Sequence, residues 1–281
     1  MAERISIAKL TERVTQMRDD ELDELAADSR RGVSVLLRRE RRRREALANE
    51  KRRLEDMLTH ERELWSKGRI VAGVDEVGVG PLAGPVMAAA VVLPSGCSVS
   101  GIDDSKQLDR STRESLAATV RECALAWSLG TCDRHEIDRM NIYQAAREAM
   151  RRAVIGLSHR IDALLVDART VPGVDLLQRP IIKGDQHSQS IAAASIVAKV
   201  ERDAWMREAA SRYPGYGFES HKGYYCPQHL EALARLGPCA LHRRSFSPVA
   251  AQCSSQELEA LDAIRSDERQ ARPPEPQIGL F

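Results

Sequence analysis

Residues 71–85 read VAGVDEVGVGPLAGP, an apolar strand followed by two adjacent carboxylates and a loop with glycines at 78, 80 and 84. Carboxylates at a strand end, beside exposed backbone N–H groups, favour a cation and a phosphate held close to the main chain. A dinucleotide-binding loop is the rival interpretation of the glycines. It fits poorly, because that fold places its acid after the next helix, whereas Asp75 and Glu76 precede the glycines. A plain tight turn is the structural alternative.

The adjacency of Asp75 and Glu76 raises a geometric difficulty. Neighbouring residues of a regular strand point to opposite faces, so both carboxylates can serve one site only if the strand ends or bulges there. The following Gly78 and Gly80 favour such a break. We therefore expect the strand to cover residues 70–74 and to be interrupted at the carboxylates.

Two further acids follow strand-like segments in the same part of the chain. Asp167 ends the run LLVD, and Asp185 ends IIKGD after a glycine. A single aspartate at a strand end is usually a turn former or a helix cap. If the strands are neighbours, however, four carboxylates converge, repel one another and are best neutralised by a divalent ion. Hard oxygen ligands without Cys or His favour Mg²⁺ or Mn²⁺ over Zn²⁺.

The segments around these acids predict an α/β domain with a mixed five-stranded sheet flanked by helices. Short β-rich runs alternate with helical stretches between residues 69 and 250. The expected strands cover residues 70–74, 86–93, 125–130, 164–166 and 180–182. The expected helices cover residues 112–123, 142–157, 191–210 and 227–235.

Both ends of the chain differ from this domain. Residues 1–68 have no strand-like run and predict a helical extension, in which residues 31–53 contain ten Lys or Arg against three Glu, a net charge of +7. A solvated helix explains most charge runs, but one clustered sign also suits phosphate contact, so we hypothesise a secondary nucleic-acid grip. Residues 251–281 predict one more helix and then a Pro-rich flexible tail.

Composition excludes several classes of protein. The chain has 281 residues with 42 Lys+Arg against 41 Asp+Glu, so a uniformly basic nucleic-acid coat is excluded. Its longest apolar run, residues 86–93, is far shorter than the roughly 20 residues that span a bilayer. The six cysteines form no CxxC pair and predict reduced thiols. We expect a cytoplasmic monomer without a membrane segment.

Taken together, seven motifs between residues 69 and 250 are specific enough to name a resemblance: the chain resembles the bacterial ribonucleases HII. The matching segments, in family order, are DEVGVGPLAGPV (75–86), DSKQL (104–108), LLVDA (164–168), KGDQHSQSIAAASIVAKVERD (183–203), YPGYGF (213–218), HKGY (221–224) and HRRSF (242–246).

The resemblance implies a ribonuclease H-like fold and a metal-dependent endonuclease. Such enzymes cut the RNA strand of RNA–DNA hybrids and incise 5′ to single ribonucleotides in duplex DNA, leaving 3′-hydroxyl and 5′-phosphate ends. By similarity, the catalytic metal ligands are Asp75, Glu76, Asp167 and Asp185. They would hold two Mn²⁺ or Mg²⁺ ions, one for the attacking water and one for the leaving oxygen.

The resemblance also implies substrate contacts. The backbone of the loop formed by Gly78, Val79 and Gly80 would recognise the 2′-hydroxyl, although the family usually has Arg where this chain has Val79. Tyr224 matches a tyrosine that packs on the sugar after the ribonucleotide, with Cys226 replacing a hydroxyl residue nearby. The resemblance and the helix-start pattern add a set of phosphate contacts: Lys106, Lys183, Ser188, Ser190 and Arg244. Ser190 is also the expected N-cap of the helix that starts at Ile191.

The final five residues, QIGLF (277–281), resemble the peptide by which bacterial replication and repair proteins dock on the sliding clamp. Gln277 would supply a hydrogen-bonding amide, and Leu280 and Phe281 would fill an apolar groove. The Pro-rich segment before them would provide reach. A frayed tail is the alternative.

Three alternative functions stay open at this point. A type HIII ribonuclease shares the fold, although Asp185 and Tyr224 favour type HII. A non-catalytic hybrid-binding protein is supported by Val79 alone. A nucleotide-dependent oxidoreductase is a distant third.

Overall fold

The computed structural model describes residues 5–271 of the chain. Contacts between Cα atoms divide the chain into two compact units, Met1–Asp56 and Met57–Phe281, which we describe separately. Within the described residues, no helix combines the length and the apolar character that crossing a membrane requires.

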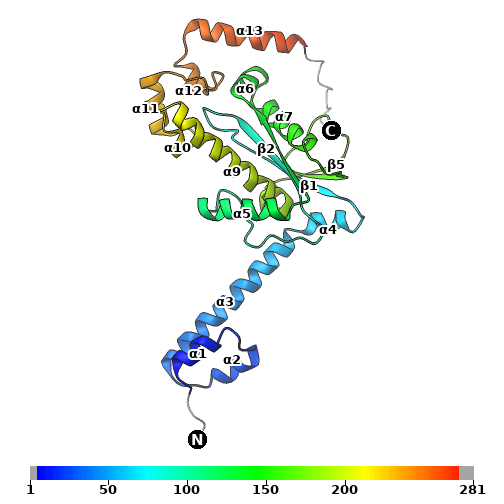
Figure 1. Cartoon of the computed structure of the whole chain (residues 1–281), viewed down its shortest axis with the longest axis vertical. Coiled ribbons are helices and arrows are strands. Elements are labelled where there is room, and N and C mark those ends of the chain that lie inside the picture. The colour runs from blue at the N-terminus through cyan, green and yellow to red at the C-terminus, as the bar shows by residue number, and fades with distance from the viewer. Residues whose placement is uncertain (1–4, 272–281) are drawn as a thin grey trace, which may run out of the picture. The chain divides into compact units, whose positions relative to one another are not determined.

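The first unit is helical, as the sequence predicts. It consists of α1 (Ile7–Arg13), α2 (Asp19–Leu25) and the long α3 (Arg31–Asp56) (Figure 1). Its small apolar core contains Leu10, Val14, Leu22, Val33 and Leu37. Ser6 caps α1 by accepting a hydrogen bond from the Lys9 amide.

The second unit is built on a five-stranded sheet with the order β3-β2-β1-β4-β5 (Figure 1). Its strands are β1 (Val71–Val77), β2 (Val86–Val92), β3 (Ala126–Cys132), β4 (Ala163–Asp167) and β5 (Leu177–Ile181). The pairs β1–β2 and β2–β3 are antiparallel, whereas β1–β4 and β4–β5 are parallel. The carboxyl ends of β1 and β4 therefore lie side by side in the centre of the sheet.

Helices cover both faces of this sheet. Alternate residues of β1 separate the two cores: Ala72 and Val74 belong to the cluster with α7 (Ile142–Ile155), and Val71 to the cluster with Ile191 of α9 (Gln189–Arg212). The start of α9 approaches β1 closely, since a Cβ on Gly73 would lie 2.0 Å from the Ser190 carbonyl carbon. Small residues thus allow α9 to pack directly behind the strand that carries Asp75 and Glu76.

The remaining helices surround this core. They are α4 (Thr59–Trp65), α5 (Arg110–Cys123), α6 (Arg134–Met140), α8 (Gly184–His187), α10 (Phe218–His221), α11 (Pro227–Leu236), α12 (Ser247–Ala250) and α13 (Ser255–Ala271). Of these, α4 contributes Leu64 to the core beside Val71.

The predicted fold class is confirmed: a mixed five-stranded sheet, flanked by helices, follows a helical N-terminal unit. The four predicted helices are present within about two residues at each end. Short α6 was missed, although Asp133 and Glu136 form a capping box that marks its start. The predicted N-cap of α9 was wrong, because Ser188 rather than Ser190 accepts the hydrogen bond from the Ile191 amide.

Candidate metal centre and glycine loop

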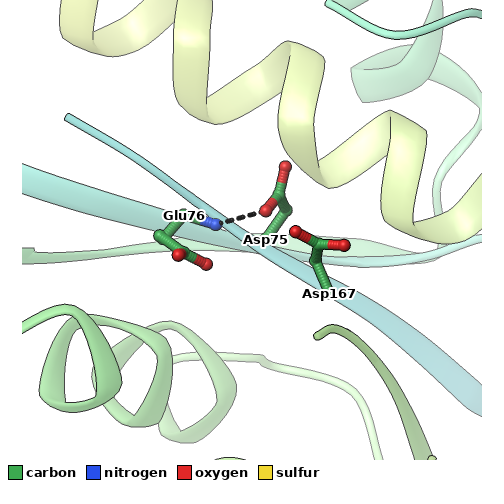
Figure 2. Close-up of side chains that lie close together, drawn as sticks. All are labelled: Asp75, Glu76 and Asp167. Atoms are coloured by element: carbon green, nitrogen blue, oxygen red, sulfur yellow. Dashed lines mark hydrogen bonds between the residues drawn. The ribbon is translucent and has the colours of Figure 1, made fainter. Parts of the chain in front are cut away.

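Three carboxylates meet where β1 and β4 stop pairing. The β1–β4 ladder ends at Val74 and Val166, and Asp75 and Asp167 are the next residues of their strands. One oxygen from each of Asp75, Glu76 and Asp167 lies within 4.8 Å of the other two (Figure 2). Oxygens at this spacing can share a cation.

The expected break in β1 was wrong. Pairing with β2 continues without a bulge through Asp75, Glu76 and Val77. Asp75 points toward α9 and Glu76 toward the other face of the sheet. The two side chains still approach each other near the carboxyl end of β1 (Figure 2). The difficulty is resolved on the β4 side, where the ladder stops and leaves the strand edge open to these side chains.

The site holds these acids at an electrostatic cost. Burial raises the pKa of Asp75 well above its ordinary value, and the charges of Glu76 and Asp167 raise it further. Burial also raises the pKa of Glu76, partly offset by Arg169. Repelling carboxylates removed from water favour protonation unless a cation neutralises them.

The partners of Glu76 leave room for such a cation. Its Oε1 lies 3.4 Å from Nη1 of Arg169, whereas Oε2 is buried and has no hydrogen-bond partner within the described residues. A buried acceptor without a donor needs an explanation such as an ion. The donor set of carboxylate oxygens is also the one that hard divalent cations prefer. The residues present therefore fit a divalent metal.

Asp185 stands beside this group rather than inside it. It lies in α8, where Oδ2 is 3.8 Å from Nζ of Lys106 and the residue is buried. Burial raises its pKa, and the charge of Asp104 adds to the shift. The two sites are linked, because the Gly184 amide donates to Oδ1 of Asp167 over 2.7 Å.

The glycine loop joins β1 to β2 directly after the carboxylates. Gly78 and Gly84 both have φ of +86°, and a Cβ on Gly78 would lie 2.2 Å from Nε of Arg202. Gly80 differs, because it has no positive φ and a Cβ there would meet nothing within 4 Å. The fold itself explains Gly78 and Gly84, whereas Gly80 leaves open space at the surface.

The loop is docked on the segment that carries Tyr224. The Leu82 amide donates to the Gly223 carbonyl over 2.8 Å, and a Cβ on Gly223 would lie 2.5 Å from the Ala83 carbonyl oxygen. The Tyr224 ring is 38% exposed and lies 5.5 Å from both Nζ of Lys199 and the guanidinium of Arg202. It is therefore a supported aromatic at the surface.

The predicted phosphate contacts are placed unevenly. Lys106 and Lys183 are exposed, and Lys183 precedes α8 with a left-handed backbone. Ser188 and Ser190 are buried, and Glu61 of α4 accepts hydrogen bonds from the Ser188 hydroxyl and the Ser190 amide. These hydrogen bonds secure the start of α9, and the expected contact of the two serines with phosphate stays a prediction.

Two further residues of the matching motifs pair with partners outside the acidic group. Arg244 lies 2.7 Å from Glu257 of α13 and is not brought to the carboxylates. Asp203 pairs with Lys199 over 2.8 Å, so its carboxylate serves a structural ion pair on α9. The residues 277–281 lie outside the described part of the chain.

Comparison with known proteins assigns this arrangement to a family. Residues 72–249 match the family model described as Ribonuclease HII. The chain belongs to the ribonuclease HII family. A second model, described as the ribonuclease HII N-terminal domain, matches residues 6–65. The similarity extends to the ribonuclease HII of Myxococcus xanthus, at 54% identity over 81% of this chain and 78% of the relative, and to that of Lactobacillus delbrueckii, at 51% over 81% and 89%.

Solved structures agree on the fold. The ribonuclease H2 of Pyrococcus horikoshii superposes with a TM-score of 0.54 at 24% identity, covering 71% of this chain and 99% of that one. The ribonuclease HII of Archaeoglobus fulgidus, solved in complex with PCNA, gives 0.53 at 24%, covering 63% and 95%. At this identity the likeness supports the architecture alone.

Membership of the ribonuclease HII family decides between the alternatives. The protein is a metal-dependent endonuclease that acts on RNA–DNA hybrids, so the oxidoreductase and the non-catalytic binding protein are excluded. The family model and the relatives are type HII rather than type HIII. Sequence reasoning missed Asp104, Arg169 and Arg243 as contributors to the site, because each acts through a contact that only the fold creates.

Proposed function

We propose that this ribonuclease HII incises 5′ to single ribonucleotides in duplex DNA, as well as cutting the RNA strand of hybrids, and leaves 3′-hydroxyl and 5′-phosphate ends. The observation that carries the proposal is the convergence of Asp75, Glu76 and Asp167 beside a glycine loop with free amides. A phosphodiester and its 2′-hydroxyl can meet both features at once.

The ions that suit this centre are Mg²⁺ or Mn²⁺. Asp75, Glu76 and Asp167 would hold one end of the centre, and Asp185 would complete it from α8. When bound, two such ions supply activation of the attacking water and stabilisation of the leaving 3′ oxygen. The chain's own contribution is to fix the ligands, since Gly184 orients Asp167 and the Glu76 amide donates to Asp75 over 2.8 Å.

Recognition of the ribonucleotide is assigned to the glycine loop. The amides of Gly78, Val79 and Gly80 donate to no acceptor within the described residues, so they are available to a 2′-hydroxyl and its phosphate. The open space over Gly80 lets a sugar approach the main chain. Tyr224 would then pack on the next sugar, and Lys106 and Lys183 would contact phosphates.

Val79 sets this chain apart from the usual family pattern. The loop amides do not depend on that side chain, whereas a phosphate contact from an arginine is lost. We expect Val79→Arg to raise the affinity for duplex substrates and to steepen the salt dependence by about one phosphate contact. An unchanged salt slope would show that the position faces no phosphate.

The first unit is proposed as a secondary grip on nucleic acid. On α3, Arg31, Arg38, Arg39 and Arg42 are exposed and have no partner within the described residues, whereas Arg41 pairs with Asp23 over 2.6 Å. Replacing Arg38, Arg39 and Arg42 by Gln should reduce the salt slope of hybrid binding by about 2 to 3, and Arg41→Gln serves as the paired control. Equal slopes for the wild type and the triple variant would reject the grip.

The C-terminal residues Gln277, Leu280 and Phe281 are proposed to dock on a sliding clamp. The archaeal relative solved with PCNA gives this proposal a precedent within the family. Changing Leu280 and Phe281 to Ala should abolish binding to the bacterial clamp and leave the incision of a short duplex unchanged. Equal clamp affinity would reject the motif.

We also propose that the enzyme acts as a cytoplasmic monomer, in line with six free cysteines.

Incision is tested with three duplexes of one sequence: an RNA–DNA hybrid, a DNA duplex with one ribonucleotide and an all-DNA duplex. The proposal predicts cleavage of the first two only, in Mn²⁺ or Mg²⁺, and 3′-hydroxyl ends that a polymerase extends. Cleavage of the hybrid alone would contradict the single-ribonucleotide activity.

A further inference from the structure

The glycine loop is held from beneath by a buried arginine. Arg243 is 0% exposed. It donates from Nε to the Gly84 carbonyl over 2.9 Å, from Nη1 to Val79 over 3.0 Å and from Nη2 to Gly78 over 2.6 Å. All five donors of a guanidinium are fixed in one plane, so one side chain can capture several carbonyls at once.

A second buried arginine holds the rest of the loop. Arg202 of α9 is also 0% exposed. It donates to the carbonyl of Pro85 over 2.9 Å and of Ala83 over 3.2 Å, and to Lys222 over 3.1 Å. Because Lys222 belongs to the HKGY segment, Arg202 connects the glycine loop to the segment that carries Tyr224.

Neither arginine has a carboxylate partner among the described residues. Every hydrogen bond of the two side chains goes to a main-chain oxygen. Burial lowers the pKa of Arg243, and the charge of Arg202 lowers it further, so the two cations lie close together. Burying two like charges close together without anions is costly.

The two arginines fix the direction in which the main-chain groups of the loop point. Carbonyls of Gly78 and Val79 are directed inward to Arg243, and the amides of Gly78, Val79 and Gly80 are left without acceptors in the described chain. The segment GVGPLAGP (78–85) has no charged side chain of its own. The positive charge that a bound phosphate would experience beneath the loop thus comes from the buried pair.

We propose that Arg202 and Arg243 are positioning residues for ribonucleotide recognition: they lock the glycine loop with its amides outward and place a fixed positive field beneath the substrate phosphate. This inference rests on the proposed function of the loop. The family usually has an arginine at the position of Val79, and its positive charge is missing from the loop of this chain. In our proposal the buried pair Arg202 and Arg243 provides positive charge instead, in the protein interior, where solvent ions screen it least.

The test uses Arg202→Lys and Arg243→Lys in the full chain, which keep the charge and lose the planar fork of donors. Arg207→Lys is the matched control, because Arg207 also lies on α9 but pairs with Glu114 over 3.2 Å. For each protein we would measure the KM for a duplex with one ribonucleotide and the inhibition constant of the same duplex made of DNA alone. The ratio of the two constants reports ribonucleotide preference. The rise in melting temperature caused by Mn²⁺ reports the carboxylate centre.

We expect both lysine variants to lose at least tenfold in preference, while the Mn²⁺ effect and the control variant stay at wild-type values. Folded variants that keep their preference within twofold would overturn the inference. Failure of both lysine variants to fold would overturn it too, because the arginines would then be required for the fold itself. A wild type without any preference would instead defeat the proposed function of the loop.

Discussion

In the first unit, the buried carboxylate of Glu40 lies between two arginines, 2.7 Å from Arg43 and 2.8 Å from Arg44. In the second unit, the buried carboxylate of Asp75 and the half-buried carboxylate of Glu76 instead face a third one, Asp167. Hydrogen bonds from Arg43 and Arg44 lower the pKa of Glu40 to about 2, whereas burial and mutual repulsion raise the pKa values of Asp75 and Glu76. Arginines of the chain thus compensate the carboxylate of Glu40, whereas the group of three acids is compensated only in part, by Arg169 at 3.4 Å from Glu76.

The cations of the second unit sharpen this difference. Arg202 and Arg243 are buried as well, yet they bond to main-chain carbonyls of the glycine loop and not to the acids. Within the described residues, these two arginines form no ion pair with Asp75, Glu76 or Asp167. Buried charge of this kind is typical of functional sites, and we propose a metal ion at the acids and a phosphate at the loop.

The largest expected effect follows from removing one carboxylate of the acidic group. Glu76→Gln keeps the shape of the side chain and removes a candidate metal ligand, so we expect incision of the single-ribonucleotide duplex to fall by about 10³-fold, or about 4 kcal/mol of transition-state stabilisation. Steady-state rates in Mn²⁺ and Mg²⁺ check this. A loss below tenfold in both metals would contradict a ligand role.

The glycine loop offers a comparison between two glycines. Gly78→Ala forces a side chain into a positive-φ position against Arg202, so we expect a loss of about 1–3 kcal/mol in unfolding free energy. The Cβ of Gly80→Ala has no atom of the described residues within 4 Å, and stability should change by less than about 0.5 kcal/mol. Its KM for the ribonucleotide duplex should nevertheless rise on the order of tenfold, because the methyl group occupies the space of the sugar. Denaturant unfolding and kinetics measure both, and a Gly80→Ala enzyme with normal KM would remove that contact.

Divalent metal should stabilise the second unit in a pH-dependent way. Asp75, Glu76 and Asp185 have raised pKa values in the folded protein. Groups of this kind stabilise the fold when protonated, so metal-free stability should fall as pH rises from about 4 through the raised pKa values. Mn²⁺ at about 100 times its Kd should restore about 2.7 kcal/mol at neutral pH and far less at pH 4.5. Thermal unfolding with and without Mn²⁺ checks this, and an equal Mn²⁺ effect at both pH values would argue against these ligands.

The smallest effect is expected in the first unit. Glu40 has a lowered pKa, so its stabilisation is present above the unfolded pKa of about 4.3 and is lost as pH falls toward 2. Glu40→Gln should therefore lower the hydrogen-exchange protection of residues 7–56 at pH 7. In the wild type this protection should fall between pH 4.5 and 2.5, and in the variant that fall should be absent. Divalent metal should leave the hydrogen exchange of residues 7–56 unchanged in both the wild type and the variant. If the variant exchanged like the wild type at pH 7, the ion pairs of Glu40 would contribute nothing measurable.

Much of the fold and the acids of the site could be predicted from sequence. Strand-like runs ending in Asp75 and Asp167 were sufficient for these two acids, because parallel pairing brings strand ends together. Asp185 follows β5 in α8 and lies outside the group of three. The prediction of a break at Asp75 failed, since the sequence does not show that the β4 partner stops at Val166 while β2 continues.

The roles of single polar residues were harder to predict. Ser188 and Ser190 look equally suited to cap a helix, and only the close packing of Gly73 on Ser190 and the position of Glu61 separate them. Arg243 stands in HRRSF beside Arg244 without any local signal that one is buried and the other pairs with Glu257. Tertiary contacts decide such roles, and those of Arg243 and Glu61 join segments more than a hundred residues apart.

The most direct test compares two aspartates in the catalytic unit. Asp75→Asn removes a carboxylate from the acidic group, and Asp203→Asn removes one that is paired with Lys199 on α9. Both enzymes, with the wild type, are incubated with a DNA duplex that contains one ribonucleotide, in Mn²⁺ or Mg²⁺. The account predicts incision 5′ to the ribonucleotide by the wild type and Asp203→Asn, and none by Asp75→Asn. Incision by Asp75→Asn at the wild-type rate would contradict it.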